Sequence, residues 1–242
     1  MKRANNINYS YFNEIDTEYK AYILGFIYAD GSLIKTSENR QDRLVISIQE
    51  EDSYILQKLL DDTNNNKVIT RNPPSTIKNE WKKQGTASIN SDEIFNDLIK
   101  IGCIPNKTNL GMTFPKLHES LIHHFIRGFF DGDGCITIHK RIYKGVNKTS
   151  AYFSKRIAFT STDSIFLDIL CSYLPITNLY KKITKRSLLV YTYWIERQSD
   201  VKNVEDYLYN NCNYFLKRKK DKFNMSIKSQ AIDKSIEGLT TT

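Results

Sequence analysis

Two stretches of nine residues, 23–31 and 126–134, follow nearly the same order of apolar, small and acidic positions. The first reads ILGFIYADG and the second reads IRGFFDGDG. If each stretch forms a helix, apolar residues lie on almost every side of it, which is typical of a buried helix. Small residues at that spacing let two helix backbones approach closely, so the pattern predicts a tightly packed pair of helices. Each stretch carries two such residues four positions apart: Gly25 with Ala29, and Gly128 with Gly132.

The same succession of helix and strand patterns follows each stretch. After the first, the pattern predicts strands at 32–35 and 44–49, a helix from Asp52, strands at 67–71 and 81–90 around a turn at Pro73-Pro74, and a helix capped by Ser91 that ends at Gly102. After the second, it predicts strands at 135–141 and 152–160, a helix from Asp163, strands at 178–185 and 188–195, and a helix from Ser199 or Asp200. The predicted fold class is α+β, with two pseudo-symmetric αββαββα halves and antiparallel sheets.

The halves are expected to occupy residues 1–110 and 121–242, joined by a linker at 111–120 that contains Pro115. The offset between equivalent positions grows from 103 at the repeated stretches (133 − 30) to 111 at the next helix start (163 − 52). We expect the extra residues in a longer hairpin tip around 143–150.

Each repeated stretch ends in an acidic residue, Asp30 or Asp133, followed by Gly31 or Gly134. The glycines are expected to end the helices in the left-handed conformation. A carboxylate at a helix C-terminus is disfavoured by about 0.3–1 kcal/mol, and two such ends side by side also repel each other. A divalent cation removes both costs, and Mg²⁺ fits because it binds carboxylate oxygens, waters and substrate phosphates. A single Asp-Gly pair would indicate only a turn, so the repetition carries this prediction.

Composition narrows the class of protein. The chain has 242 residues, 40% of them hydrophobic and 26% charged, which is typical of a globular protein with a substantial core. Its net charge of +8 and pI near 9.1 favour a polyanionic partner. No apolar run approaches the roughly 20 residues that cross a membrane, and the N-terminus has no secretory pattern. The four cysteines and four histidines show no metal-ligand or disulfide spacing.

The doubled motif resembles the LAGLIDADG homing endonucleases in their single-chain, two-motif form, over roughly Tyr19 to Phe223. The resemblance implies a monomer whose sheets form a DNA-binding saddle and which makes a staggered double-strand break in a long asymmetric DNA target. It implies divalent metal at Asp30 and Asp133, with the backbone carbonyls of Ala29 and Gly132 as further ligands. It also implies Mg²⁺ as cofactor, with Mn²⁺ as an alternative and Ca²⁺ supporting binding without cleavage.

One departure from exact repetition is Tyr28, which stands where the second copy has Asp131. This position precedes the metal residue by two and faces elsewhere on the helix, so the metal prediction is unaffected.

Cleavage also needs charge stabilisation at the phosphate, and the resemblance implies a lysine just after the third helix of each half. Lys107 and Lys219 stand at these positions, although Lys219 lies in a run that could equally be a solvated basic segment on the DNA backbone. The resemblance also implies a polar residue that orders solvent at the cut, and Gln49, at the end of a predicted strand, is the candidate for it. Its counterpart by alignment is Thr160.

Basic residues gather on the predicted strands and hairpin tips. An antiparallel sheet can enter the DNA major groove and read base edges with such side chains. The candidates for DNA contact are Lys35, Arg40, Arg43, Arg71, Lys82, Lys140, Arg141, Lys155, Arg156, Lys182, Lys185, Arg186 and Arg197.

Two alternatives remain at the level of sequence: an intron RNA maturase and a non-catalytic DNA-binding regulator on the same fold. The paired acidic residues favour the nuclease, because binding alone gains nothing from carboxylates that face phosphates. The expected location is intracellular: the cytoplasm of a bacterial or phage-infected cell, or an organelle.

Overall fold

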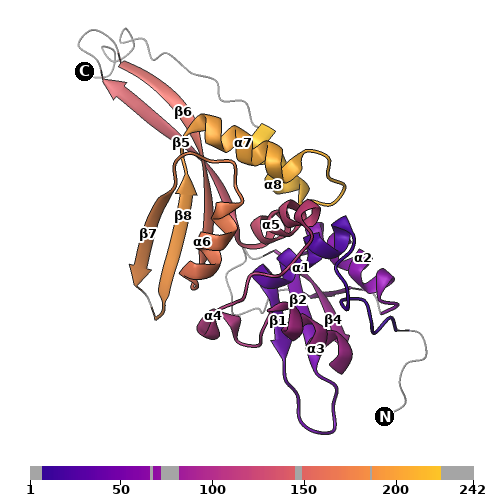
Figure 1. Ribbon diagram of the computed structural model, residues 1–242. Helices are drawn as coiled ribbons and strands as arrows, with labels where there is room; N and C mark the ends of the chain where they lie inside the picture. Colours follow the sequence, from indigo (N-terminus) through magenta and orange to yellow (C-terminus); the bar gives the residue numbers. More distant parts are fainter. Residues whose placement is uncertain (1–6, 66–67, 72–81, 145–148, 186, 225–242) are drawn as a thin grey trace, which may run out of the picture.

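The computed structural model describes residues 7–65, 68–71, 82–144, 149–185 and 187–224 (Figure 1). The expected turn at Pro73-Pro74 and the candidate Arg186 lie outside these residues. Arg71 and Arg141 belong to described strands, but their side chains are outside the description.

Both halves contain the expected succession of elements. The first consists of α1 (Glu18–Asp30), β1 (Gly31–Ile34), β2 (Arg43–Gln49), η1 (Glu50–Asp52), α2 (Tyr54–Asp62), β3 (Ile69–Arg71), β4 (Gln84–Asn90) and α3 (Asp92–Ile101). The second consists of α5 (Glu119–Asp133), β5 (Cys135–Lys144), β6 (Thr149–Ser161), α6 (Ser164–Ser172), β7 (Tyr180–Lys185), β8 (Leu189–Ile195) and α7 (Gln198–Tyr209). Two short helices, α4 (Lys107–Leu110) and α8 (Lys217–Asn224), follow the third helix of each half.

The two sheets share one topology. Their strand orders are β1-β2-β4-β3 and β5-β6-β8-β7, and every neighbouring pair is antiparallel. The order is equivalent position by position, so the prediction of an α+β fold with two pseudo-symmetric halves is confirmed. In Figure 1 the sheets lie on either side of the central helices α1 and α5.

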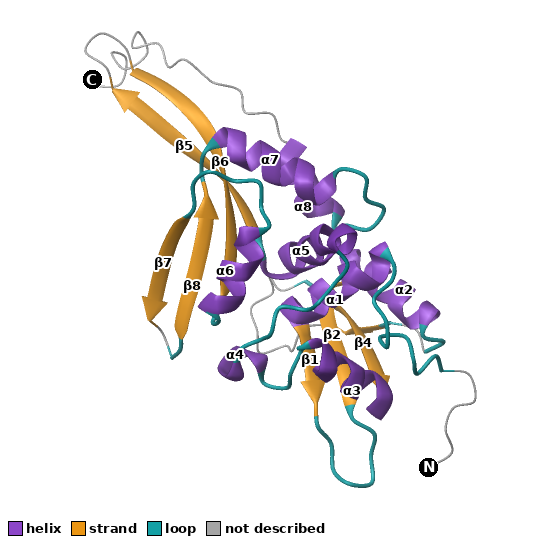
Figure 2. Ribbon diagram, in the orientation of Figure 1, coloured by secondary structure: helices purple, strands orange, loops and turns teal. Residues whose placement is uncertain are grey.

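Helices cover one face of each sheet and leave the other open (Figure 2). Helices α2 and α3 contact the first sheet, and α6 and α7 contact the second. In β2, Leu44, Ile46 and Ile48 are buried while the alternate positions keep contact with solvent. Because side chains alternate along a strand, Arg43 and Gln49 lie on the open face.

The repeated helices α1 and α5 pack against each other at their small residues. A Cβ atom at Gly25 would overlap the backbone carbonyl of Phe125, and one at Gly128 would overlap that of Tyr22. The close approach predicted from the spacing is therefore confirmed. Nearly all of α1 from Tyr19 to Tyr28 is buried, as the apolar pattern indicates.

The expectation for the glycines that follow these helices is wrong. Gly31 has φ −73° and Gly134 has φ −70°, so both are extended rather than left-handed. Each helix continues directly into a strand, β1 or β5, without the reversal that a left-handed cap would give. Glycine is needed here for space: a Cβ atom would meet the backbone of Ile27 at 2.6 Å in one half and the carbonyl of Phe130 at 2.5 Å in the other.

Other helix ends follow the local sequence signals. Ser91 accepts a hydrogen bond from Ile94 N, and Asp163 accepts one from Phe166 N, as N-cap residues do. Gly102 ends α3 in the left-handed region at φ 116°. One element starts later than expected, since Asp52 closes the short η1 and α2 begins at Tyr54.

The largest departure is the first hairpin of the second sheet. Strands β5 and β6 extend to Lys144 and Thr149, so both ends of the expected long tip are paired strand. Figure 1 shows this ribbon running well beyond the rest of its sheet. Across the residues that the structure describes, no helix is long and apolar enough to cross a membrane.

Candidate active site

The C-terminal ends of α1 and α5 bring Asp30 and Asp133 close together. Gly132 lies against Ala29, and a Cβ atom at Gly132 would stand 3.3 Å from the Asp30 Oδ2 atom. Both aspartates keep contact with solvent. Protein crowds them from one side, and this loss of hydration raises the pKa of both carboxyl groups. For Asp133 the neighbouring Asp30 charge adds to the effect, and the pKa rises to about 6.

Lys107 and Lys219 occupy equivalent places beside these aspartates. The Lys107 ammonium, half-buried on α4, donates a hydrogen bond to the backbone carbonyl of Gly31. The Lys219 ammonium, only 6% exposed on α8, donates to the carbonyls of Phe130, Gly132 and Gly134 at 2.7, 3.0 and 2.6 Å. Each lysine therefore reaches the glycine that follows the motif helix of its own half. Lys219 is not a solvated member of a basic run.

Burial changes the acidity of both lysines. It lowers the pKa of Lys107, and it lowers the pKa of Lys219 to about 8. The two carboxylates oppose this effect, because they favour the charged ammonium. Each half can thus keep one charged lysine ammonium group next to the two motif carboxylates.

The acidic pair suits a divalent cation. Among the described residues, no hydrogen bond or ion pair reaches either carboxylate, and no group of three or more His, Cys, Asp or Glu side chains forms a metal cage. Two unpaired carboxylates without further side-chain ligands leave coordination positions for waters and phosphate oxygens, as Mg²⁺ requires. The Gly132 carbonyl already accepts the hydrogen bond from Lys219. Its role as a ligand, like that of Ala29, stays a prediction.

A cavity of about 420 Å³ opens beside this pair. Ala29, Lys107, Asp133 and Thr160 contribute to its lining. Thr160 is the counterpart of Gln49 in the second half, and it borders this cavity. Gln49 ends β2 opposite Gln84, and its role in solvent ordering stays a prediction.

Sequence reasoning missed the residues that hold the lysine-bearing segments in place. Two residues before each motif aspartate, a polar group reaches the chain that follows the third helix. The Tyr28 hydroxyl lies 3.1 Å from the Ile101 carbonyl and 3.0 Å from that of Thr113. The buried Asp131 carboxylate accepts hydrogen bonds from Tyr22 OH, Tyr209 OH and Leu216 N. The mismatch of Tyr28 with Asp131 was the available signal.

A second missed group is the buried Arg127, which is fully shielded from solvent. It forms an ion pair with Glu18 at 2.8 Å and donates hydrogen bonds to the carbonyls of Leu208 and Tyr214. Glu18, at the start of α1, also accepts from the backbone of Asn213. This cluster joins the first half to the segment after α7. An arginine inside an apolar helix pattern was its only signal.

Comparisons with known proteins agree with this geometry. Residues 126–231 match the family model described as LAGLIDADG endonuclease. The LAGLIDADG resemblance is confirmed. No curated protein matches the chain.

Solved structures of LAGLIDADG proteins share the fold across both halves. The meganuclease I-AabMI bound to uncleaved DNA has 17% identity and a TM-score of 0.56, over 85% of this chain and 87% of that one. The I-LtrWI homing endonuclease bound to target DNA has 11% identity and a TM-score of 0.54, over 90% and 88%. I-DmoI in complex with DNA and Ca has 17% identity and a TM-score of 0.53, over 86% and 98%.

The two sheets divide the candidate DNA contacts between two faces. Strand alternation puts Arg43, Arg71, Arg141, Arg156 and Lys182 at open-face positions. Arg156 there pairs with Glu196 and packs over Trp194.

Three other candidates lie on the helix side of the sheets, two of them within strands and Lys35 just after β1. Lys35 pairs with Asp42 at 2.7 Å, and Lys155 donates to the Phe223 carbonyl. Lys140 shares this side with Ile136 on β5. Contact of these three with DNA stays a prediction that the geometry does not favour.

The remaining candidates lie at strand ends and in loops. Lys82 pairs with Glu51 at 2.9 Å, and Arg197 donates to the Thr177 hydroxyl. Arg40 stands in the loop between β1 and β2, and Lys185 ends β7. Their contact with DNA also stays a prediction.

Proposed function

We propose that this protein is a site-specific double-stranded DNA endonuclease that depends on a divalent metal and acts as a monomer. The observation that carries the proposal is the pairing of Asp30 with Asp133 at the ends of α1 and α5, each flanked by the lysine of its own half. A non-catalytic regulator would gain nothing from this arrangement.

The residues have distinct parts in the proposed reaction. Asp30 and Asp133, with the Ala29 and Gly132 carbonyls, would hold Mg²⁺ or Mn²⁺, and the metal supplies an activated water and charge stabilisation at the scissile phosphate. Lys107 and Lys219 would stabilise the negative charge that develops on the phosphate. Gln49 and Thr160 would orient solvent from the two strand ends.

The pseudo-two-fold arrangement supports a staggered break. Equivalent groups from the two halves face opposite strands when a duplex lies across both open sheet faces. Three of the similar LAGLIDADG structures are described as bound to DNA, one of them with Ca. By analogy, Ca²⁺ is proposed to support binding without cleavage here.

Different sheet sequences in the two halves support a long asymmetric target.

We propose that the halves occupy residues 1–110 and 121–242, with a linker at 111–120. We also propose that the protein acts inside the cell or in an organelle.

The test is a cleavage selection on a randomised duplex DNA library with Mg²⁺, followed by mapping of both cut ends. We expect one enriched asymmetric sequence with staggered ends. Specific binding without cleavage in Mg²⁺ or Mn²⁺ would indicate a regulator. Tighter binding to structured RNA than to any duplex would indicate a maturase.

A further inference from the structure

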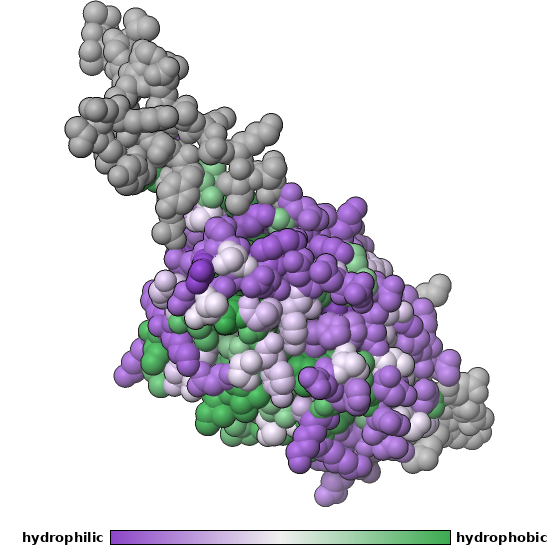
Figure 3. Space-filling model, turned by 45° about the horizontal axis from the view of Figure 1, so that its top comes forward, coloured by the Kyte–Doolittle hydropathy of each residue, from purple (hydrophilic) through white to green (hydrophobic). Residues whose placement is uncertain are grey.

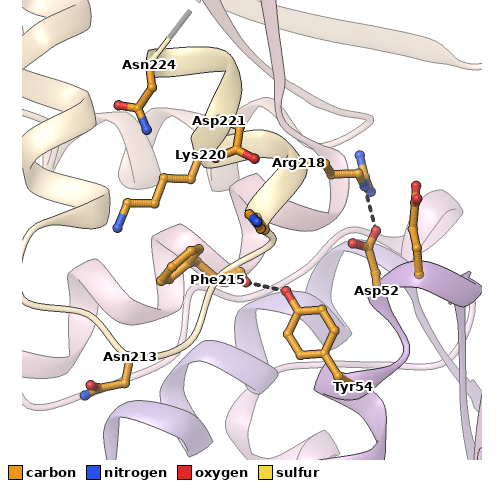
Figure 4. Close-up of a pocket in the computed structure, with 10 residues that line it drawn as sticks. Asp52, Tyr54, Asn213, Phe215, Arg218, Lys220, Asp221 and Asn224 are labelled. Atoms are coloured by element: carbon orange, nitrogen blue, oxygen red, sulfur yellow. Dashed lines mark hydrogen bonds and ion pairs between the residues drawn. The ribbon is translucent and has the colours of Figure 1, made fainter.

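The two halves also meet where α8 faces η1 and the start of α2 (Figure 4). A cavity of about 820 Å³ lies there, lined by residues of η1, α2 and α8. Asp52, only 3% exposed, accepts a hydrogen bond from Arg218 Nε at 2.6 Å. The Tyr54 hydroxyl donates to the Phe215 carbonyl at 2.8 Å. The first half therefore holds the N-terminal turn of α8 by one contact and the chain just before that helix by another.

That turn carries Lys219. Arg218, the residue just before Lys219, contacts Asp52 of the first half. Leu216 N donates to Asp131 of the second half at 2.7 Å. The lysine is thus carried by a turn that is fastened to both halves, while its ammonium group reaches the end of α5.

The opposite corner repeats this arrangement. Asp163 follows Thr160 by three residues, as Asp52 follows Gln49, so the two aspartates are equivalent. The Asp163 Oδ2 atom accepts a hydrogen bond from Met112 N at 2.9 Å. Close by, the Thr162 hydroxyl donates to the Thr108 carbonyl at 2.6 Å. These contacts hold the segment with α4, which carries Lys107, against the second half.

We propose that Asp52 and Asp163 are positioning residues, each of which holds in place the lysine that belongs to the other half. Asp52 acts on Lys219 through Arg218, and Asp163 acts on Lys107 through the backbone of Met112. The inference rests on the proposed nuclease function, and it makes the position of each lysine depend on both halves.

The physical need for such anchors follows from the length of the helices. α4 has four residues and α8 has eight, and helices this short are not stable in isolation. A lysine side chain also loses much rotamer freedom when it is fixed. Without an anchor, the turn that carries the lysine would shift, and a displacement of about 1 Å can cost about 100-fold in rate.

The decisive experiment compares strand-specific cleavage rates on a doubly labelled target. Lys219→Met and Lys107→Met first identify the strand that each lysine serves. We expect Asp52→Ala and Arg218→Met to slow the Lys219 strand by about 10- to 100-fold and to change the other strand by less than about threefold. We expect Asp163→Ser to slow the Lys107 strand, because serine keeps the helix cap but does not reach Met112 N.

Three controls separate positioning from general destabilisation. Asp61→Ala removes an exposed aspartate of α2 that contacts Gln57, and it should leave both strand rates unchanged. DNA affinity in Ca²⁺ should stay within about threefold of the parent for all variants. In the double variant Asp52→Ala/Lys219→Met, the Asp52 change should add no further slowing, because both act through one group.

Amide hydrogen exchange of the free protein tests the anchor without cleavage. Residues 217–224 should exchange faster in Asp52→Ala while 107–110 stay as in the parent. Equal slowing of both strands, or unchanged exchange in α8, would overturn the inference. A parent protein that cuts no DNA would instead overturn the proposed nuclease function, and the exchange result would still decide whether Asp52 anchors α8.

Discussion

The two halves of this chain have one topology, but they hold their lysines with different chemistry. In the first half the Tyr28 hydroxyl reaches the carbonyls that flank α4. In the second half the Asp131 carboxylate accepts hydrogen bonds from two tyrosines and from Leu216 N. A donor and an acceptor thus do the same work at equivalent positions. The fold therefore requires a fixed segment after the third helix, and not a particular residue that fixes it.

A second difference lies one turn earlier on the same helices. Arg127 of α5 stands where α1 has Leu24. Leu24 lies in the apolar core, whereas Arg127 joins Glu18 and two backbone carbonyls. The buried arginine therefore connects the third helix and following loop of the second half to the first turn of α1.

The largest expected effect is a loss of stability when the close contact between α1 and α5 is disrupted at Gly25 or Gly128. Gly25→Leu and Gly128→Leu should each lower the free energy of unfolding by more than about 3 kcal/mol, because a backbone carbonyl occupies the space and cannot move aside. Chemical denaturation measures the loss, with Asn96→Leu at an exposed position of α3 as control. A tolerated leucine at either glycine would show that the helices are not closely packed.

The next largest loss of stability should follow a change on α5 but not the equivalent change on α1. Arg127→Met leaves Glu18 partly buried without its cation, and we expect a loss of about 3 kcal/mol in the free energy of unfolding. The matched change Leu24→Met should cost less than about 1.5 kcal/mol, since it conserves volume in the core. The same denaturation curves give both values. Equal losses would mean that the halves are held together in the same way.

Neighbouring lysines of β7 test which sheet face meets DNA. Lys182 lies on the open face, whereas Lys181 points to the helix side and pairs with Asp168. Lys182→Ala should weaken DNA binding and reduce the slope of log affinity against log salt by about one. Lys181→Ala should leave the slope unchanged. The reverse result in a fluorescence anisotropy titration would invert the assignment of the faces.

The smallest expected effect is a displacement of the pH profile. Because the pKa of Asp133 is raised to about 6, its carboxylate takes up a proton as the pH falls through that value. The protonated form does not bind metal, so cleavage should decline below about pH 6. More Mg²⁺ competes with the proton and should move the midpoint to lower pH. A midpoint that ignores Mg²⁺ concentration would separate Asp133 from the metal.

The sequence was sufficient to predict the elements and the acidic pair, because both depend on local signals. Ser91 caps its helix as expected, a helix begins at Asp163 as expected, and the small residues at four-residue spacing bring α1 and α5 together. The conformation of Gly31 was not predictable from its position alone. It depends on whether the chain reverses or continues into a strand, which the tertiary structure decides.

The supporting contacts could not be predicted for a different reason. Asp52 and Arg218 are 166 positions apart, and Asp131 meets Leu216 across 85 positions. Pairings at such separations leave no periodic signal in one sequence. The helix-side position of Lys155 was predictable in principle, since it lies two and four positions before the buried Ile157 and Phe159 and so shares their face of β6.

The sequence pattern also did not predict which apolar side chains are exposed. Ile165 and Tyr180 are more than half exposed in the second half. Figure 3 shows green areas of this kind on a mostly hydrophilic surface.

The central claim is that one carboxylate from each half forms a single metal-dependent site. The most direct test measures double-strand cleavage by Asp30→Asn and Asp133→Asn in Mg²⁺, together with their DNA affinity in Ca²⁺. We expect neither variant to make a double-strand break, while both bind the target within about tenfold of the parent, or about 1.4 kcal/mol. Cleavage by either variant at the rate of the parent would contradict the claim.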